Sequence, residues 1–407
     1  MADYICHSQM TYDLVPPKEI FSRISRFQKE LANTSLDGAV ILDGINMFYY
    51  TGTIQNGVLF VPAEGEPLFF IRRSLERAKR ETPLKVLVSF TSLDELPPRL
   101  DDYGYRTSTL GVDETTIPFS IFRKLSSAFS HRTFQDINRS LSTIRSVKSD
   151  YEIGLIREAG KRHKALYDEI PALIQEGMTE WELGSAIHAH MLKLGYTGIC
   201  RLSAFNSELF AGVISFGESG NFPTASVGPD GLVGLSPAFS LLGGTRRLKG
   251  ADIIFIDTGF AYEGYYTDKT RVFVLGDPPQ EAVDAHKTCL EIQEAVRCRL
   301  KPGALPSQIY EEVYRTEVVS RSFQEHFMGY GSNQVPFLGH GIGLVIDEFP
   351  AIAGKVDFPL KKNMVIAVEP KKGLKGIGLV GVENTFVVTE QGGEKLTPGS
   401  DEITVVS

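Results

Sequence analysis

Acidic side chains stand in pairs on either side of two chain reversals in the C-terminal half of the sequence. Asp257 and Asp268 flank the turn around Tyr262 and Glu263 in 253-IIFIDTGFAYEGYYTDKTRVFV-274. If the flanking strands pair across that turn, the two carboxylates lie opposite each other, with Cβ atoms roughly 5 Å apart. Like charges at that distance cost stability or force one group to keep a proton. A divalent cation between them removes this problem.

The second reversal repeats the arrangement. Glu369 and Glu383 flank a glycine-rich turn centred on Gly376 in 364-MVIAVEPKKGLKGIGLVGVENTFVV-388. Both lie in otherwise apolar strands, where an unpaired carboxylate is costly. One such residue alone is more simply an edge or turn carboxylate that faces water. Two hairpins, each with an acidic pair symmetric about its turn, favour a shared function.

A histidine, His340, lies between the hairpins in 337-FLGHGIGLVIDEFP-350. Glycines on both sides leave the backbone bare, which suits close approach of a metal ion or a substrate. On this stretch alone, a strand-end histidine that bonds a carbonyl is the simpler interpretation. Together with the four carboxylates, His340 completes a ligand set for two divalent ions that share a water molecule.

Oxygen-rich ligation with one imidazole favours Mn²⁺, Co²⁺, Fe²⁺ or Zn²⁺ over a thiolate-type site. Two such ions would make a hydroxide available near neutral pH and stabilise a tetrahedral intermediate. The predicted cofactor is therefore a pair of divalent metal ions.

The length of 407 residues suggests two domains. Residues 18–33 predict an amphipathic helix with Ile20, Ile24, Phe27 and Leu31 on one face. The strand-like runs GAVILD, MFYYTG, GVLFVP and EPLFFIR follow it, and helical segments come later. This alternation predicts an α/β domain that ends near residue 140.

The segment LSTIRSVKSDYEIGLIREAGKRHKALYDEI then predicts a long helix that joins the two domains. Thr179 and Glu182 form a capping box at the start of the next helix. Strand-like runs dominate from about residue 198, with helices predicted at roughly 278–300 and 306–326.

Composition excludes several classes of protein. Hydrophobic content of 42% and charged content of 23% are typical of a soluble globular protein. The net charge of −8 and the absence of a basic stripe argue against nucleic-acid binding. No apolar run is long enough for a membrane span, and MADYICHSQMTYD has no signal-peptide pattern.

The cysteines have no C-x-x-C spacing, which favours reduced thiols in a cytoplasmic protein. They are Cys6, Cys200, Cys289 and Cys298.

The ordered set of acidic residues and His340 resembles the five metal ligands of the pita-bread metallopeptidases, with similar local contexts: IDTG, TDKTR, GHGIGL, VEP and VEN. FYYTG and IRSVKSDYEIGLIREA resemble the prolidase, aminopeptidase P and creatinase branch of that family. The resemblance implies an α+β protein with two domains. Residues 1–145 would form a smaller α/β creatinase-like domain, and residues 146–407 a pita-bread catalytic domain of duplicated α/β structure.

The resemblance also implies roles for the five residues. Asp257 would chelate one metal ion, Asp268 and Glu383 would bridge, and His340 and Glu369 would hold the other ion. Glu369 would also carry the proton from the water to the leaving amine. Because relatives in this branch are often dimers, a homodimer is expected.

Three positions depart from the family pattern. Peptidases of the family have a second histidine where this chain has Asp347, and a third in the region of 217-GESGNFPTAS-226, which offers Thr224. These imidazoles help to bind substrate and stabilise the oxyanion, so Asp347 and Thr224 are candidate catalytic residues here. An arginine two residues before the last glutamate is replaced by Gly381.

An additional loop over residues 227–247 offers Arg246 and Arg247 as substitutes for that arginine. Arginines beside Lys249 are, however, more often solvent-facing.

Three functional interpretations remain at this point. The first is a metal-dependent hydrolase of the Xaa-Pro dipeptidase or aminopeptidase type, which cleaves a short peptide. The second is a non-peptidase metalloenzyme on the same scaffold, acting on a small C–N or C–S compound. The third is a non-catalytic binding module, against which the presence of all five ligands argues.

Overall fold

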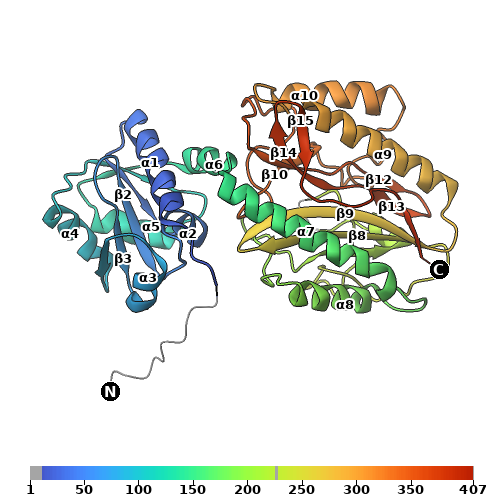
Figure 1. Ribbon diagram of the computed structural model, residues 1–407, viewed down its shortest axis with the longest axis horizontal. Coiled ribbons are helices and arrows are strands. Elements are labelled where there is room, and N and C mark those ends of the chain that lie inside the picture. The colour runs from blue at the N-terminus through green and yellow to red at the C-terminus, as the bar shows by residue number, and fades with distance from the viewer. Residues whose placement is uncertain (1–11, 225–227, 407) are drawn as a thin grey trace, which may run out of the picture. The chain divides into compact units, whose positions relative to one another are not determined.

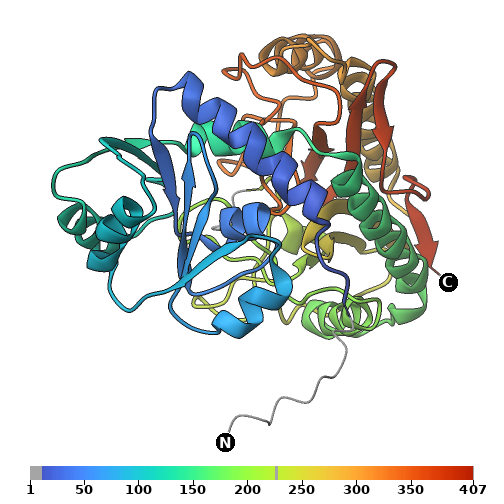
Figure 2. The ribbon, with the colours of Figure 1, turned by 60° about the vertical axis from the view of Figure 1, so that its left-hand side comes forward.

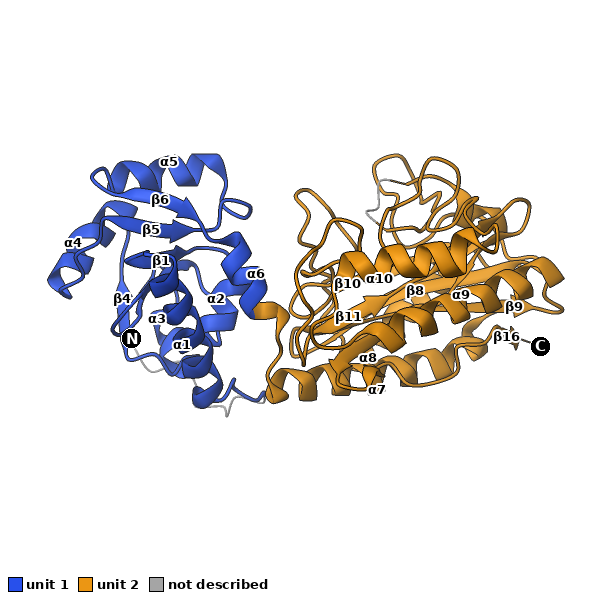
Figure 3. Ribbon diagram, turned by 90° about the horizontal axis from the view of Figure 1, so that it is seen from above, with its two compact units in different colours: residues 1–144 blue, residues 145–407 orange. Residues whose placement is uncertain are grey.

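The structure, a computed structural model, describes residues 12–224 and 228–406. Cys6 and most of the N-terminal segment without a signal-peptide pattern lie outside the described residues. The chain divides into two compact units, residues 1–144 and residues 145–407 (Figure 3). Within the described ranges, no helix combines the length and the apolar character that a membrane crossing requires.

The first unit is a mixed sheet surrounded by helices. Across the sheet the strands follow the order β4-β3-β2-β1-β5-β6. These strands are β1 (Gly38–Ile41), β2 (Gly57–Pro62), β3 (Leu68–Ile71), β4 (Val86–Ser89), β5 (Thr109–Val112) and β6 (Thr133–Asp136). The α-helices are α1 (Pro17–Asn33), α2 (Gly44–Thr51), α3 (Leu75–Glu81), α4 (Leu96–Asp102) and α5 (Phe119–Ala128). The predicted α/β character of this region is therefore confirmed.

Helix α1 confirms the amphipathic pattern at residues 18–33. Its predicted apolar residues Ile20, Ile24, Phe27 and Leu31 are all buried. The helix, blue in Figure 2, packs against strands β1 and β2 of the same unit.

The prediction of a strand at MFYYTG was wrong, because these residues form the end of helix α2. The β-branched and aromatic composition favours a strand, but local capping favours the helix. The Asp43 side chain accepts a hydrogen bond from the backbone N–H of Asn46 at 2.7 Å, which caps the first turn. Gly52, at φ +77°, ends the helix in the left-handed conformation.

The predicted joining helix is two helices, α6 (Asn138–Ser146) and α7 (Asp150–Leu173). Between them, Val147 forms a β-bridge with Met364, and the Lys148 N–H donates to the Asn363 carbonyl at 3.0 Å. Ser149 then starts α7 as the first residue of a capping box. A single helix was therefore the wrong prediction, because tertiary pairing interrupts it.

The second unit contains sheets of order β16-β9-β8-β7, β10-β11-β14-β15 and β12-β13. The strands are β7 (Gly212–Phe216), β8 (Ile253–Tyr262), β9 (Tyr265–Leu275), β10 (Gly339–Gly341), β11 (Val365–Val368), β12 (Lys371–Leu374), β13 (Gly378–Gly381), β14 (Asn384–Thr389), β15 (Gly392–Lys395) and β16 (Thr404–Val406). The remaining α-helices are α8 (Glu180–Lys193), α9 (Gln280–Arg299) and α10 (Pro306–Val313).

Helices cover these sheets on two sides (Figure 1). Helix α7 packs against β8 and β9, while α9 packs against β12, β13 and β15. The capping box at Thr179 is confirmed as the start of α8. The helix predicted at roughly 306–326 is shorter than expected, because α10 ends at Val313 and passes into a π-helical turn at Tyr314–Val319.

In the first hairpin the register differs from the one predicted. Asp257 pairs with Thr270, and Asp268 pairs with Gly259, because the strands reverse through Glu263 and Gly264. The two aspartates are therefore not directly opposite, as predicted, but one diagonal step apart on the same face. Diagonal neighbours are roughly 7–8 Å apart, which separates the two like charges.

In the second hairpin the register is symmetric about Gly376, as predicted. Strand β12 pairs with β13 so that Lys371 faces Gly381, and farther out Val368 on β11 faces Asn384 on β14. The two glutamates lie in the breaks between these strands rather than within them.

Candidate metal centre

The structure brings together the five side chains proposed as metal ligands. Asp257 and Asp268 come from β8 and β9, and His340 is the middle residue of β10. Strand β10 pairs with β11, which ends just before Glu369, and β14 begins just after Glu383. All four carboxylate residues are buried, and the side chain of His340 is 16% exposed.

His340 points one ring nitrogen at the carboxylates. Its Nδ1 lies 3.0 Å from the Gly341 carbonyl oxygen, which can only accept, so Nδ1 carries the proton. In the neutral ring, Nε2 therefore offers a lone pair. Nε2 lies 3.4 Å from Glu369 Oε1, 3.7 Å from Glu383 Oε1 and 4.0 Å from Asp268 Oδ2.

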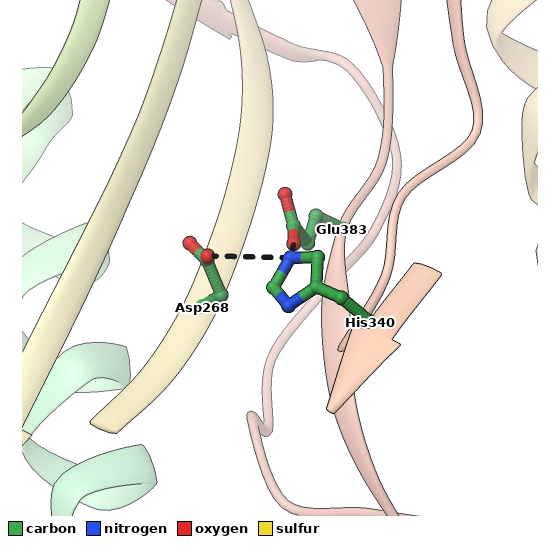
Figure 4. A group of neighbouring side chains, drawn as sticks. All are labelled: Asp268, His340 and Glu383. Carbon is green, nitrogen blue, oxygen red and sulfur yellow. Dashed lines mark ion pairs between the residues drawn. The ribbon is translucent and has the colours of Figure 1, made fainter. Parts of the chain in front are cut away.

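These separations suit a shared cation. Figure 4 shows the side chains of Asp268, His340 and Glu383 directed toward one another, and one ligand atom of each lies within 4.8 Å of the others. Ligand atoms each about 2.1 Å from one ion are separated by roughly 3–4 Å. Glu383 Oε1 is buried and has no hydrogen-bond partner within the described part of the chain. A carboxylate oxygen without a hydrogen-bond partner, close to an imidazole nitrogen that can bind metal when deprotonated, fits a divalent metal ion.

Burial and the neighbouring charges shift the pKa values of these groups. Burial by itself lowers the pKa of His340, but Glu369 and Glu383 raise it to about 9. Burial raises the pKa of Glu383 to about 8, against the effect of Lys371. Burial, Glu383 and Asp257 raise the pKa of Asp268 well above its usual value. A divalent ion would displace the protons that these groups hold.

The side chain of Lys371 lies among the carboxylates, a position that was not predicted from the sequence. Its Nζ donates to Asp257 Oδ2 at 2.6 Å, to Glu369 Oε2 at 2.9 Å and to Glu383 Oε2 at 3.1 Å. A signal was available, because residues two apart in an extended segment share a face, and Lys371 follows Glu369 by two.

Asp230 was missed as well. Its Oδ1 lies 3.1 Å from Lys371 Nζ, and the residue is buried. Asp230 belongs to a glycine-rich segment with no periodic pattern, so its position could not be predicted from spacing. Its backbone carbonyl accepts a hydrogen bond from the Asn333 side chain at 3.3 Å.

Nearby charges of opposite sign determine the ionisation states of Lys371 and Glu369. Burial by itself lowers the pKa of Lys371, but Asp230, Asp257, Glu369 and Glu383 raise it well above its usual value. Burial raises the pKa of Glu369, but Lys371 and His340 outweigh it and lower the pKa to about 2. Lys371 is therefore an ammonium and Glu369 a carboxylate at neutral pH.

The two positions at which metal ions were predicted differ in what lies beside them. The position bounded by Asp268, His340 and Glu383 suits one ion. The other position, beside Asp257, holds the Lys371 ammonium, whose Nζ is 2.6 Å from Asp257 Oδ2.

Neighbouring side chains hold the carboxylates in place. Thr270 Oγ1 donates to Glu383 Oε2 at 3.1 Å, and Arg271 Nη1 donates to the Glu383 carbonyl at 2.9 Å. The Asp268 N–H donates to Thr385 Oγ1 at 2.9 Å. Such outer contacts fix the orientation of candidate ligands.

Asp347 and Thr224, the predicted substitutes for the missing histidines, have different surroundings. Asp347 accepts hydrogen bonds from the Ser203 N–H at 2.6 Å and from Ser203 Oγ at 2.9 Å. Burial raises the pKa of Asp347, while Ser203 and the nearby His340 oppose that effect. Thr224 is half-buried, and no hydrogen bond or ion pair joins it to the described residues of the centre.

Arg246 and Arg247, the candidate substitutes for the missing arginine, bind elsewhere. Arg246 Nη2 donates to Asp252 Oδ1 at 2.9 Å, and Arg247 Nη1 donates to the Gly177 carbonyl at 2.7 Å. Within the described residues neither forms an ion pair with the centre, so the suggested compensation was wrong.

The fold and the site define a metallopeptidase-like hydrolase with a creatinase-like first domain, as predicted. Residues 154–390 match the model of Metallopeptidase family M24, and residues 23–147 match that of the Creatinase/Prolidase N-terminal domain. The chain belongs to metallopeptidase family M24. Members of this family generally bind divalent metal ions.

Known relatives extend over nearly the whole chain. It is 26% identical over 384 residues to a Xaa-Pro dipeptidase of Pyrococcus furiosus, covering 94% of this chain and 99% of that protein. The crystal structure of an X-Pro aminopeptidase from Thermotoga maritima is similar with a TM-score of 0.77 and 27% identity, covering 94% and 99% of the two chains. A Xaa-Pro dipeptidase from Bacillus anthracis shares the fold, with a TM-score of 0.79, 23% identity and coverage of 95% and 99%.

Proposed function

We propose that this protein is a metal-dependent hydrolase of short peptides, of the Xaa-Pro dipeptidase or aminopeptidase type. One observation carries the proposal, namely that His340 Nε2 and the carboxylates of Asp268, Glu369 and Glu383 converge in a chain of family M24. Similarity to a Xaa-Pro dipeptidase over 94% of the chain supports the substrate class.

In this proposal Asp268, His340 and Glu383 hold a divalent ion. Oxygen ligands with one imidazole suit Mn²⁺, Co²⁺, Fe²⁺ or Zn²⁺. When bound, such an ion lowers the pKa of a water molecule and polarises a carbonyl group. The Gly341 carbonyl fixes the tautomer of His340, and Thr270 orients Glu383 through its hydroxyl.

Glu369 is the proton carrier in this proposal. Its Oε1 lies 3.4 Å from His340 Nε2, and its Oε2 accepts a hydrogen bond from Lys371 at 2.9 Å. Lys371 and His340 lower its pKa to about 2, so the carboxylate is ionised at neutral pH. Because so weak a base takes no proton from ordinary water, this role requires a water molecule whose own pKa is lowered by the bound ion. The same group can then pass that proton to the leaving amine.

A second candidate is a non-peptidase metalloenzyme that acts on a small C–N or C–S compound. Asp347 favours it, because Ser203 holds a carboxylate where peptidases of the family have a histidine. A carboxylate accepts hydrogen bonds and does not stabilise an oxyanion. It suits a substrate with a donor or a cationic group at that position.

A panel assay separates the two candidates. The protein is freed of metal, reloaded in separate samples with Mn²⁺, Co²⁺, Fe²⁺ or Zn²⁺, and incubated with Ala-Pro, Gly-Pro, a longer Xaa-Pro peptide and matched peptides without proline. Selective release of the residue before proline supports the peptidase. If no peptide is cleaved with any of the four candidate metals, the peptidase proposal fails and the small-molecule enzyme is favoured.

Two further expectations from the sequence belong to this proposal, a homodimer and a cytoplasmic location. Light scattering of the purified protein measures its mass in solution, and a mass of one chain would contradict the dimer. Fractionation of the source cells tests the location.

A further inference from the structure

We propose that the Lys371 ammonium permanently replaces one of the two cations that this group of carboxylates can hold, so that the chain binds a single divalent ion. This inference rests on the proposed function, because it concerns the same metal centre. It also assigns new roles, since Asp230 and Asp257 become partners of the lysine rather than ligands of a metal.

The contacts of Lys371 are those of an enclosed cation. Its side chain is fully buried, and its Nζ lies within 3.1 Å of oxygens from Asp230, Asp257, Glu369 and Glu383. All of these acceptors are carboxylates. Such a surrounding is unusual for a lysine, since buried ammonium groups are stable only when they are well paired.

A second divalent ion competes for the same oxygens. Glu383 divides its oxygens between the two positions, with Oε2 on Lys371 and Oε1 toward His340. Glu369 does the same, with Oε2 on Lys371 and Oε1 toward His340. With an ion held by Asp268, His340 and Glu383, the two glutamates would lie between two positive charges, one of which is the Lys371 ammonium.

The backbone keeps Lys371 in this position. Lys371 pairs with Gly381 across the β12–β13 hairpin, and its carbonyl accepts a hydrogen bond from the Met328 N–H at 2.8 Å. The neighbouring Lys372 points elsewhere, and its Nζ donates to the Phe323 carbonyl at 3.1 Å. Withdrawal of the ammonium would therefore leave the buried carboxylates without their cation while the strand stayed in place.

Gly381 provides the space for the lysine. A Cβ atom at position 381 would lie 2.7 Å from Lys371 Cα and 2.9 Å from Lys371 Cγ. No real Cβ atom makes contacts that short, so a side chain at Gly381 and the observed course of Lys371 exclude each other. The observed position of Lys371 therefore requires glycine at residue 381.

Metal stoichiometry tests the inference. The full-length protein, Lys371→Ala and Lys375→Ala are freed of metal and titrated with Mn²⁺, with bound metal measured by calorimetry and elemental analysis. Lys375 is a matched control, because it lies exposed in the same hairpin. The parent and Lys375→Ala are expected to bind one ion per chain. Lys371→Ala is expected to bind two, with the spin-coupled electron paramagnetic resonance signal of neighbouring Mn²⁺ ions.

A second pair of variants covers the case in which Lys371→Ala does not fold. Asp257→Asn is expected to keep the single ion, because its carboxylate binds the lysine, whereas Asp268→Asn is expected to lose it. Loss of the ion in Asp257→Asn would overturn the inference. Circular dichroism confirms that each variant is folded.

Two ions per chain in the parent protein, or none, would also overturn the inference, as would a single ion in folded Lys371→Ala. Its failure is distinct from that of the proposed function. A protein that binds one ion but cleaves no peptide refutes the peptidase and leaves the inference standing. A protein that binds two ions and cleaves Xaa-Pro peptides supports the peptidase and refutes the inference of a single ion.

Discussion

The two sides of the metal centre neutralise their carboxylates in different ways. Toward His340, ligand atoms of Asp268, His340 and Glu383 lie within 4.8 Å of one another, as an external metal ion requires, and Glu383 Oε1 lacks a hydrogen-bond partner among the described residues. Toward Asp257, the chain supplies its own cation in Lys371. An ammonium group balances charge and orients carboxylates, but it has no open coordination position for water. Chemistry should therefore be confined to the His340 side.

The comparison also separates two kinds of contribution to stability. The lysine is covalently attached, so its ion pairs form as the chain folds and do not depend on metal concentration. An external ion stabilises the folded state by an amount that grows with the logarithm of its concentration relative to its dissociation constant. Removal of metal should therefore reduce the stability contributed by the His340 side and leave the ion pairs of Lys371 intact.

The largest effect is expected at Glu369, which touches both sides. Glu369→Gln removes the carboxylate that accepts the proton, so kcat/KM for a cleaved peptide should fall by about 10²–10⁴-fold. Steady-state kinetics with saturating Mn²⁺ measure this loss. Glu325→Gln is the control, since the Glu325 side chain is 84% exposed. Retention of more than a tenth of the activity would remove Glu369 from its proposed role.

Loss of the attached cation should cost stability even without metal. Lys371→Met keeps most of the side-chain volume but leaves Asp230, Asp257, Glu369 and Glu383 without their shared partner. Breaking a buried ion pair in this way costs about 3–5 kcal/mol. Urea unfolding in the presence of a chelator measures the change. Lys375→Met, on the exposed turn, should change stability by no more than about 0.5 kcal/mol, and equal effects of the two substitutions would contradict the comparison.

The difference between the two sides explains what the sequence could predict. The acidic pairs and His340 occur in short motifs and at symmetric positions about turns, so they could be recognised from spacing. Lys371 lies in the same motif, but lysine is ordinarily a surface residue, and its inward orientation becomes evident only from the burial of its neighbours. Asp230 had no signal at all, because its place depends on a segment without periodicity.

The fold shows the same division between local and tertiary information. The amphipathic pattern of α1 and the capping box of α8 are local, and both predictions were confirmed. The break between α6 and α7 and the register of the first hairpin depend on pairing with distant residues. The run MFYYTG was misread because its composition favours a strand, while the cap at Asp43 favours a helix.

A smaller loss of stability is expected from substitution of Gly381, which leaves space for Lys371. In Gly381→Ala the new Cβ would lie 2.5 Å from the Pro370 carbonyl oxygen and 2.7 Å from Lys371 Cα, so the strand must shift. Overpacking of this kind costs about 1–3 kcal/mol. Thermal and urea unfolding measure it, with Gly154→Ala as the control, because a Cβ at Gly154 meets nothing within 4 Å. A Gly381→Ala protein as stable as the parent would show that the glycine is not required.

The two sides should also differ in their response to pH. Metal-free His340 and Glu383 have pKa values of about 9 and about 8, so both keep protons at neutral pH that a bound ion must displace. Affinity for Mn²⁺ should therefore rise with pH from 6 to 8, by about tenfold per pH unit for each proton released, and level off above pH 9. Calorimetry in buffers of different ionisation enthalpy counts those protons. An affinity that is constant between pH 6 and 8 would contradict protonated ligands.

The smallest effect is expected at Asp347, beyond the His340 side of the centre. His340 is close enough to lower the pKa of the Asp347 carboxyl group, but Asp347 is partly exposed and already paired with Ser203. Asp347→Asn should therefore weaken a favourable contact with a cationic substrate group by only about 0.2–1 kcal/mol, a rise in KM of up to about fivefold. Asp277→Asn, on an exposed turn, is the control.

The form of the Asp347→Asn effect identifies what the carboxylate faces. If KM rises for Ala-Pro but not for its N-acetylated form, the carboxylate contacts the free amino group of a peptide. If both substrates change equally, Asp347 acts only through the loop that Ser203 anchors. The substitution therefore shows whether the carboxylate at this position serves a peptide amine, as the peptidase requires, or leaves the small-molecule alternative as the better account of the departure from histidine.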